Sequence, residues 1–292
     1  MTSLADLDQE LRRIGSEYSG TWTYALTDIA SGEQIGFDSD DVMPTASLLK
    51  VPILNALYQA EHEGKLALDD RTTYREEHRC LGSGVLERLT PGVEMSVRDA
   101  AVLMIIISDN SATNMVIDLM GLDYINEQLR RLGLEQTAIF QRLGERAQGP
   151  DARTMSVSTA TEMARLLALI ARNEAGSPEA SQDMLRILRR QDYRHELSRE
   201  LPWNEMNMLL DYKQNWVAEK GGAFLNGIRT AGAIFHSARG HFVMAAFCEG
   251  GTGIGGTGRE SEGNVHIGRL GYAAWRALVA PVPLTDALTA PE

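Results

Sequence analysis

The chain is poor in lysine and in long apolar runs, and each shortage excludes a class of protein. Only four of its 28 lysine and arginine residues are lysines, and the net charge of the 292 residues is −12. Such an acidic chain does not suit nucleic acid or an anionic membrane as a partner. No apolar run approaches the ~20 residues that a membrane helix needs. We therefore expect neither nucleic acid nor membrane as a partner.

Cysteine is also scarce, and histidine shows no pattern of metal ligands. Cys80 and Cys248 lie far apart and outside any Cys-x-x-Cys spacing. We favour two free thiols, with one disulfide as the alternative. The six histidines share no ligand spacing on a helix face, so we expect no metal. Gly251, Gly253 and Gly256 fit Gly-x-Gly-x-x-Gly, but the later strand and acidic residue of a dinucleotide fold are missing. We expect no cofactor.

The first six residues lack the charged region, apolar stretch and cleavage site of a secretory signal. This start predicts a cytoplasmic protein if the N-terminus is native. The protein would be secreted or periplasmic if a leader has been removed.

The periodicity of apolar residues predicts helix and strands at both ends of the chain, around a helical middle. Within residues 4–18, apolar side chains recur every three or four positions, which predicts a helix. Residues 22–26 and 33–37 have the pattern of strands. Helical segments are predicted at 48–60, 97–107, 112–119, 124–132, 159–171 and 178–188. Strands are predicted at 216–219, 228–236 and 241–248, and a closing helix at 265–278.

This order predicts an α/β (α+β) fold: one antiparallel sheet from both chain ends, flanked by helices, with an inserted all-helical lobe. The sheet domain would comprise residues 1–46 and 195–292. The helical domain would comprise residues 47–194. The sequence does not reveal the oligomeric state, and we expect a monomer.

A serine and a lysine stand three positions apart at the start of an apolar helical segment. Ser47 opens the predicted helix and Lys50 follows one turn later, so their side chains share a face, with Cβ atoms about 5–6 Å apart. A lysine beside other cations and away from water has a lowered pKa and can accept a proton from the serine. The plain structural alternative is a serine N-cap followed by a solvated lysine.

Two further motifs follow in order along the chain. Ser108-Asp109-Asn110 comes directly after an apolar run, where it supplies either a helix cap or a second hydroxyl and an amide for chemistry. Lys220-Gly221-Gly222-Ala223 ends a predicted strand and is either a glycine turn with an exposed lysine or a strand edge along which a substrate lies.

The three motifs together resemble the Ser-x-x-Lys, Ser-Asp-Asn and Lys-Thr-Gly series of class A β-lactamases and penicillin-binding serine hydrolases. The resemblance implies an acylated nucleophile, Ser47, with Lys50 as its base and Ser108 as a proton shuttle. Asn110 would hold the substrate, and Gly222 would let its backbone lie against the strand edge. Lys220 and Arg229 would bind its carboxylate. The N–H groups of Ser47 and Ala223 would form the oxyanion hole.

The chain departs from the family at two places. The Glu-x-x-Leu-Asn loop that positions the deacylating base is absent, because Glu145 is followed by Gln148-Gly149 in place of Leu-Asn. Glu145 is therefore either a catalytic base or a solvated loop carboxylate. Gly221 replaces the threonine whose hydroxyl would help to bind a carboxylate.

Three functions remain open on the sequence alone. The first is a serine hydrolase of the β-lactamase type, opening a β-lactam or related cyclic amide through an acyl-Ser47 intermediate. The second is a D-amino-acid peptidase, esterase or acyltransferase with the same nucleophile, acting on a peptide-like substrate and releasing β-lactams slowly. The third is a non-catalytic module that binds β-lactams or peptidoglycan.

Overall fold

The computed structural model describes residues 3–144, 152–201, 215–237, 240–252 and 258–279. Its main sheet has five antiparallel strands in the order β2-β1-β10-β9-β8. These strands are β1 (Thr21–Asp28), β2 (Gln34–Phe37), β8 (Trp216–Ala223), β9 (Arg229–His236) and β10 (His241–Glu249). The prediction of an antiparallel sheet built from both chain ends is confirmed.

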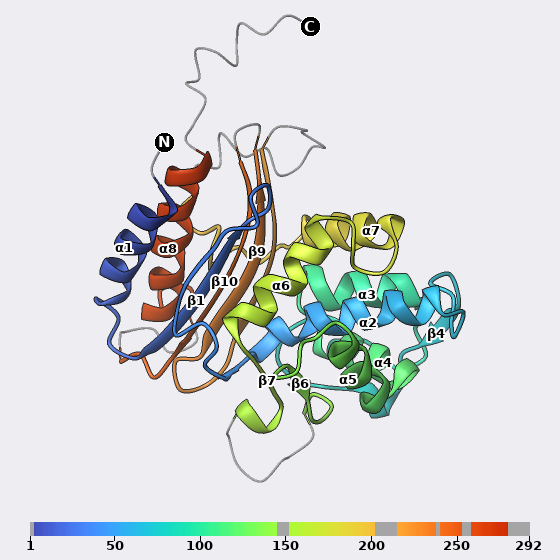
Figure 1. Cartoon of the computed structure of the whole chain (residues 1–292). Helices are drawn as coiled ribbons and strands as arrows, with labels where there is room; N and C mark the ends of the chain where they lie inside the picture. Colours follow the sequence, from blue (N-terminus) through green and yellow to red (C-terminus); the bar gives the residue numbers. More distant parts are fainter. Residues whose placement is uncertain (1–2, 145–151, 202–214, 238–239, 253–257, 280–292) are drawn as a thin grey trace, which may run out of the picture.

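Two helices cover one face of this sheet. They are α1 (Leu4–Gly15) and α8 (Glu262–Val279), which lie side by side in Figure 1. Ser3 begins α1 with a capping box to Asp6. The helix ends at Gly15, three residues before the sequence pattern predicts. Alternate residues of β10, including Phe242 and Met244, face these helices and join Trp275 of α8 in one apolar cluster.

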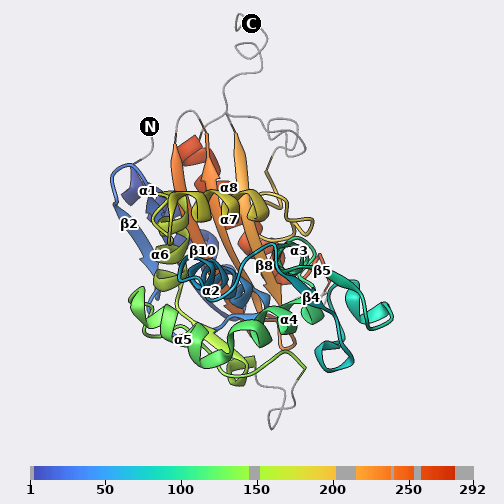
Figure 2. The same ribbon diagram turned by 90° about the vertical axis from the view of Figure 1, so that its right-hand side faces the viewer.

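The other face of the sheet packs against helices of the middle segment. Val243, Ala245 and Phe247 of β10 point to this side and belong to a second apolar cluster. This alternation along one strand follows from the two-residue period of a strand. Figure 2 shows α6 (Ala160–Ala171) and α7 (Pro178–Leu188) crossing in front of the sheet.

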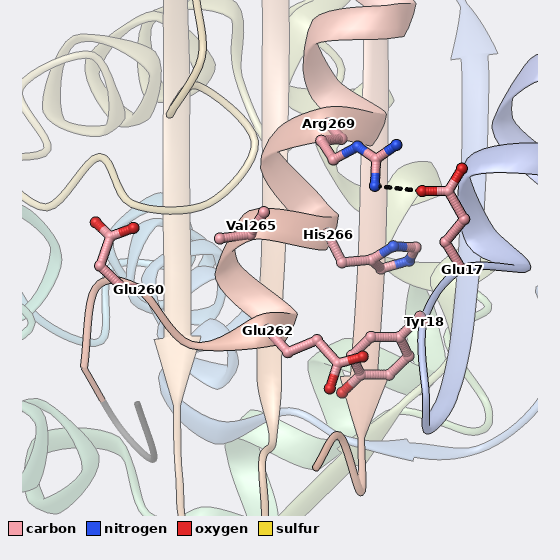
Figure 3. A pocket seen from close by; sticks show the side chains of 7 residues that line it. All are labelled: Glu17, Tyr18, Glu260, Glu262, Val265, His266 and Arg269. Atoms are coloured by element: carbon pink, nitrogen blue, oxygen red, sulfur yellow. Dashed lines mark ion pairs between the residues drawn. The ribbon is translucent and has the colours of Figure 1, made fainter. Parts of the chain in front are cut away.

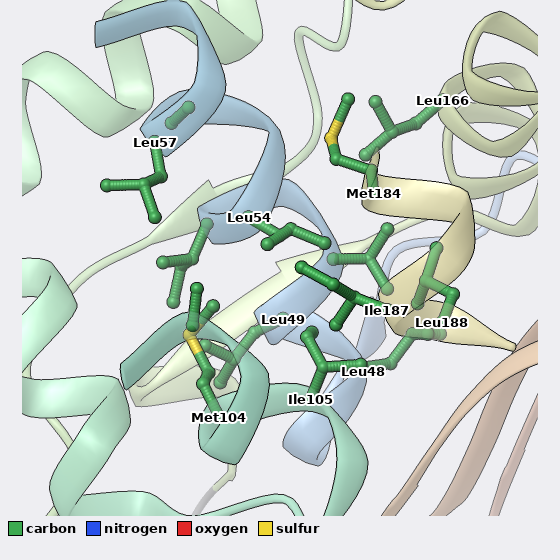
Figure 4. Close-up of a cluster of buried hydrophobic side chains, with 14 of the residues drawn as sticks. Leu48, Leu49, Leu54, Leu57, Met104, Ile105, Leu166, Met184, Ile187 and Leu188 are labelled. Atoms are coloured by element: carbon green, nitrogen blue, oxygen red, sulfur yellow. The ribbon is translucent and has the colours of Figure 1, made fainter. Parts of the chain in front are cut away.

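The helical lobe is built around one central helix, α2 (Lys50–His62). Most of its residues are buried, on every side of the helix, which is typical of a helix enclosed by a core. Figure 4 shows Leu54 and Leu57 of α2 among side chains that include Met104 and Met184. The surrounding helices are α3 (Val97–Ile106), α4 (Asn110–Met120) and α5 (Leu122–Arg131).

Short elements complete the lobe and its junction with the sheet. They are the strands β3 (Met43–Pro44), β4 (Arg71–Thr73), β5 (Glu94–Ser96), β6 (Ala138–Ile139) and β7 (Ser156–Ser158), and 3-10 turns at Ala46–Leu49, Glu76–His78, Leu86–Arg88 and Ala152–Thr154. Because α6 lies against both the sheet and α7, the lobe shares its core with one face of the sheet. The boundaries 1–46, 47–194 and 195–292 stay a prediction.

Three further features concern the cysteines, the metal ligands and the length of the apolar helices. Cys80 and Cys248 are free and buried. Among the described residues, we find no group of three or more histidine, cysteine, aspartate or glutamate side chains arranged to hold a metal ion. No helix within the described ranges is long and apolar enough to cross a membrane.

Candidate active site

Ser47 lies where the sheet meets the helical lobe. It sits in the single 3-10 turn Ala46–Leu49, and the α-helix begins only at Lys50, whereas the sequence pattern predicts an α-helix from Ser47 onward. Ser47 is half-buried and lines a cavity of about 170 Å³. Its side chain makes no hydrogen bond to any described residue, so the hydroxyl is available to a ligand.

Lys50 is fully buried and directs its amine at the second motif. Nζ donates hydrogen bonds to the Ser108 carbonyl oxygen (2.6 Å), to Ser108 Oγ (2.9 Å) and to Asn110 Oδ1 (2.9 Å). Three acceptors favour the ammonium form, but burial and the nearby charge of Lys220 oppose it. These two causes, burial first, bring the pKa of Lys50 well below its ordinary value. The amine is thus suited to accept a proton.

Among the described residues, the amine of Lys50 makes no hydrogen bond to Ser47 Oγ. The first and second motifs are nevertheless brought together, because Ser108 lines the same cavity as Ser47. Ser108 is the bonded neighbour of Lys50 and is 4% exposed. The Ser108 hydroxyl therefore lies between the cavity and Lys50, where it could relay a proton from one to the other.

The backbone around Ser108 is held in an unusual conformation by its neighbour. Ser108 has φ +55°, in the left-handed region that few non-glycine residues adopt. Asp109 is the N-cap of α4, and its carboxylate accepts hydrogen bonds from the N–H groups of Val85, Leu86 and Ala112. The helix-cap alternative thus describes Asp109 correctly. Its two neighbours, Ser108 and Asn110, are the residues that face Lys50.

The third motif lies on an edge strand. The sequence pattern ends the strand at residue 219, but β8 continues to Ala223, so the motif belongs to the sheet and is not a turn. Within the described part of the chain, β8 pairs with β9 alone, and its other edge has no strand neighbour there. Phe224 N–H donates to the Ile228 carbonyl (3.1 Å). Because hydrogen-bonded and non-bonded pairs alternate in antiparallel strands, the N–H groups of Ala223 and Gly221 point to the open edge.

Gly222 allows β8 to approach the backbone of Ser47 closely. A Cβ atom at Gly222 would lie 2.7 Å from Ser47 N and 2.9 Å from Leu48 N, closer than non-bonded atoms tolerate. The close approach brings the outward N–H of Ala223 to the cavity that Ser47 lines. Two backbone N–H groups at such a place suit a developing oxyanion.

Lys220 and Arg229 are both buried, but only Lys220 lines the cavity. Lys220 Nζ donates to the Gly221 carbonyl (2.5 Å). Burial lowers the pKa of Lys220 to about 8, while Glu196 and Glu219 act in the opposite direction. Arg229 Nη1 donates to the carbonyls of Ile228 (2.5 Å) and Phe224 (3.2 Å). Its guanidinium is bonded to the chain and is not among the cavity-lining groups.

The cavity has further lining residues that no sequence motif indicates. These are Ser83, Tyr193, His195, Glu196, Arg259 and Asn264. They come from loops and from the first turn of α8, all distant in sequence, so only the fold brings them to Ser47. Glu145, the predicted deacylating base, lies outside the described residues. Asn114 of α4 anchors the segment that leads toward it, through hydrogen bonds with the Leu143 carbonyl (3.0 Å) and N–H (2.9 Å).

A second cavity lies beside α8 and is unrelated to the three motifs. It measures about 290 Å³, and Figure 3 shows the ion pair between Glu17 and Arg269 at its wall, near Tyr18 and His266. It contains no residue of the three motifs. Chemistry based on those motifs therefore belongs to the cavity at Ser47.

The fold and the three converging motifs define the class: an α/β protein of the β-lactamase type, with a cavity between an edge strand and a helical lobe. The sequence matches the β-lactamase enzyme family over residues 6–278. The chain belongs to this family.

Similar proteins of known structure and sequence agree with this assignment. A β-lactamase from Sphaerobacter thermophilus superposes with a TM-score of 0.83 at 26% identity, covering 96% of this chain and all (100%) of that one. The structure of PBP-A gives a TM-score of 0.79 at 27% identity, and the match covers 94% of this chain and 96% of that one. β-Lactamase L2 of Stenotrophomonas maltophilia is 34% identical over 121 residues, 41% of this chain and 37% of that protein. The β-lactamase regulatory protein BlaB of Streptomyces cacaoi is 23% identical over 204 residues, 64% of this chain and 65% of that protein. The chain thus spans less than two thirds of these last two relatives.

Proposed function

We propose that the protein is a serine hydrolase that opens β-lactams or related cyclic amides through an acyl-Ser47 intermediate. The observation that carries the proposal is the convergence on one cavity of the free Ser47 hydroxyl, the Lys50–Ser108 hydrogen bond and the open edge of β8. Family membership supports the same reaction class.

The proposed acylation relies on the cavity that Ser47 and Ser108 share and on the hydrogen bond between Ser108 and Lys50. Lys50, as the neutral amine, takes the proton of Ser47 as Oγ attacks the carbonyl carbon of the amide. The N–H groups of Ser47 and Ala223 stabilise the oxyanion, a type of interaction whose loss typically costs about 10²–10³-fold in rate. As the C–N bond breaks, the proton on Lys50 passes through the Ser108 hydroxyl to the leaving nitrogen. Asn110 would hold the acyl side of the substrate, and Lys220 its charged end.

The second half of the reaction adds water to the acyl-serine and releases the acid. Glu145 is the proposed base for this step. Its flanking sequence lacks the Leu-Asn of the family loop, and this favours a second candidate function: a peptidase, esterase or acyltransferase in which β-lactam adducts on Ser47 persist. The likeness to PBP-A also fits this candidate, since a mutant of PBP-A is described as an acyl-enzyme complex with penicillin G.

Intact-mass spectrometry during exposure to penicillin tests the nucleophile and separates the two candidates. We expect the protein to gain the mass of one penicillin and Ser47→Ala to gain none. An adduct that appears and decays within the time of hydrolysis supports the lactamase, and one that persists supports the second candidate. Glu145→Gln should prolong the adduct if Glu145 is the base. If neither penicillin nor a fluorophosphonate modifies Ser47, the chain is a non-catalytic module and the proposal fails.

A further inference from the structure

A buried carboxyl group fills the space beside Gly221, inside the cavity of Ser47. Glu196 is 6% exposed and lines that cavity together with Lys220. A Cβ atom at Gly221 would lie 2.3 Å from Glu196 Oε2 and 2.8 Å from Oε1. The carboxyl of residue 196 therefore stands where a side chain at residue 221 would begin.

Few interactions hold this carboxyl in its ionised form. Its hydrogen bond from the His195 N–H is long (3.3 Å), and no ion pair joins Glu196 to a described cation. Lys220 donates to the Gly221 carbonyl instead. A second buried carboxyl, Glu219, lies close by and accepts hydrogen bonds from Ser198. Two carboxylates with little solvent around them do not both ionise readily, because each disfavours the charge of the other.

Burial and the proximity of Glu219, in that order, raise the pKa of Glu196 to about 8, while Lys220 opposes the shift. At neutral pH the side chain is therefore mostly a neutral carboxylic acid, which has an O–H to donate. The neighbouring ammonium of Lys220 adds positive charge at the same end of the cavity.

We propose that Glu196, as a neutral acid, donates a hydrogen bond to a carboxylate of the substrate beside Lys220, and so selects substrates that carry a carboxylate near the scissile amide. This inference rests on the proposed acylation of Ser47. A hydrogen bond from O–H to a carboxylate is charge-assisted and strong, whereas an ionised Glu196 would repel the same group. Binding of the carboxylate is thus coupled to a proton on Glu196.

Several charged groups face Glu196, and the experiment must distinguish their effects on carboxylate binding from that of Glu196. They come from its own segment (His195), from β8 (Glu219 and Lys220), from β9 (Arg229) and from the segment before α8 (Arg259). Lys220 is the strongest rival, because its pKa is also lowered to about 8 and the loss of its charge would weaken carboxylate binding over the same pH range.

The test compares a substrate bearing a carboxylate with its uncharged methyl ester, as the ratio of their kcat/KM values between pH 6 and 10. In the wild type we expect the ratio to fall above about pH 8, at up to about tenfold per pH unit for each proton lost. Glu196→Ala removes the donor and should lower the ratio at neutral pH by about 10–100-fold, the usual worth of a hydrogen bond to a charged group. Glu196→Gln keeps an N–H donor and should retain most of the ratio, with a weaker fall at high pH.

Two further variants make the result decisive. The double variant Glu196→Ala/Gly221→Thr places a hydroxyl in the space that the glutamate leaves. It should restore part of the kcat/KM ratio at neutral pH, but without the pH dependence that Glu196 contributes. Glu200→Gln, an exposed carboxyl four positions along, should behave as wild type. Identical pH profiles for wild type and Glu196→Gln would assign the titration to Lys220 and overturn the inference. A ratio that rises in Glu196→Ala would show that the acid excludes carboxylates, which also overturns it.

Labelling of Ser47 with a neutral fluorophosphonate separates this inference from the proposed function. If the wild type is not labelled, the acylation mechanism fails. If all variants are labelled equally and the substrate ratios are unchanged, only the role of Glu196 fails. Glu196→Gln preserves the shape of the side chain, so it carries the test even if the alanine variant does not fold.

Discussion

Replacing Gly222 with alanine should impair acylation of Ser47 while leaving the fold intact. The added methyl group would lie 2.6 Å from Thr230 Oγ1, 2.7 Å from Ser47 N and 2.9 Å from Leu48 N. Ordinary contacts between such atoms begin near 3.4 Å, so β8 and the turn at Ser47 must separate by several tenths of an ångström. Two of the three atoms are backbone, and they cannot rotate away as a side chain would.

The separation acts on the two N–H groups that would stabilise the oxyanion. Removal of one such donor typically lowers kcat by about 10²–10³-fold, or roughly 2.7–4 kcal/mol, and a displacement of about 1 Å at a reacting centre can cost about 10²-fold. We expect Gly222→Ala to acylate at least about 10²-fold more slowly. The assay is the second-order rate of Ser47 modification by a fluorophosphonate, with the adduct followed by mass.

Gly232→Ala is the matched control on the neighbouring strand. Its added methyl would meet Leu167 Cδ1 at 2.9 Å and Leu48 Cδ1 at 3.2 Å, which are ends of flexible side chains in the core. We expect a loss of stability of about 1–3 kcal/mol from overpacking and a modification rate within a few-fold of wild type. If Gly222→Ala reacts as fast as wild type while folded, the close approach of β8 has no part in catalysis.

Three further outcomes follow from buried polar groups. Lys50→Met should slow modification of Ser47 by about 10²–10⁴-fold. In the wild type, the rate of Ser47 modification should decline as the pH falls through the lowered pKa of Lys50, because only the free amine accepts a proton. If Lys50→Met reacts at the wild-type rate, Lys50 is not the base. Asp109→Asn removes charge from an acceptor of three backbone N–H groups and should reduce the free energy of unfolding in urea by about 2 kcal/mol; no change would mean that the cap is dispensable. Asn55 is fully buried, and neither its amide nitrogen nor its oxygen has a partner among the described residues. Asn55→Leu should therefore increase the free energy of unfolding by about 1 kcal/mol, seen as a higher urea midpoint. A lower midpoint would contradict this account.

The sequence predicted the architecture well because its apolar periods change clearly between chain ends and middle. The alternation in β10 and the repeat in α1 are each produced by burial of one face. Element ends were harder to predict. The sequence pattern ends the strand before Lys220, Gly221 and Gly222, and glycine usually weakens or interrupts strands. The structure continues β8 through them, because the missing side chains are what lets the strand lie against Ser47.

The motifs identified residues whose spacing along the chain is fixed, and they missed those that the fold assembles. Ser108 and Lys50 meet through a packed helix pair that the sequence only implied. Glu196 shares no motif with Gly221, 25 positions later, and no periodicity relates a loop carboxyl to a strand glycine. The vacant space at Gly221 was visible in the sequence as a departure from Lys-Thr-Gly, but the group that fills it was not.

The shortage of lysine in this chain has a physical counterpart in the site. Arginine keeps its charge at any pH that a protein tolerates, whereas a buried lysine can release its proton. Lys50 and Lys220 are both buried and both have lowered pKa values, while Lys65 is largely exposed beside Glu63. A guanidinium at position 50 could neither accept the proton of Ser47 nor be enclosed there without a counter-charge. In a chain that uses arginine for most of its positive charge, lysine therefore stands at two buried positions in or beside the cavity, where an amine that can change its charge is chemically useful.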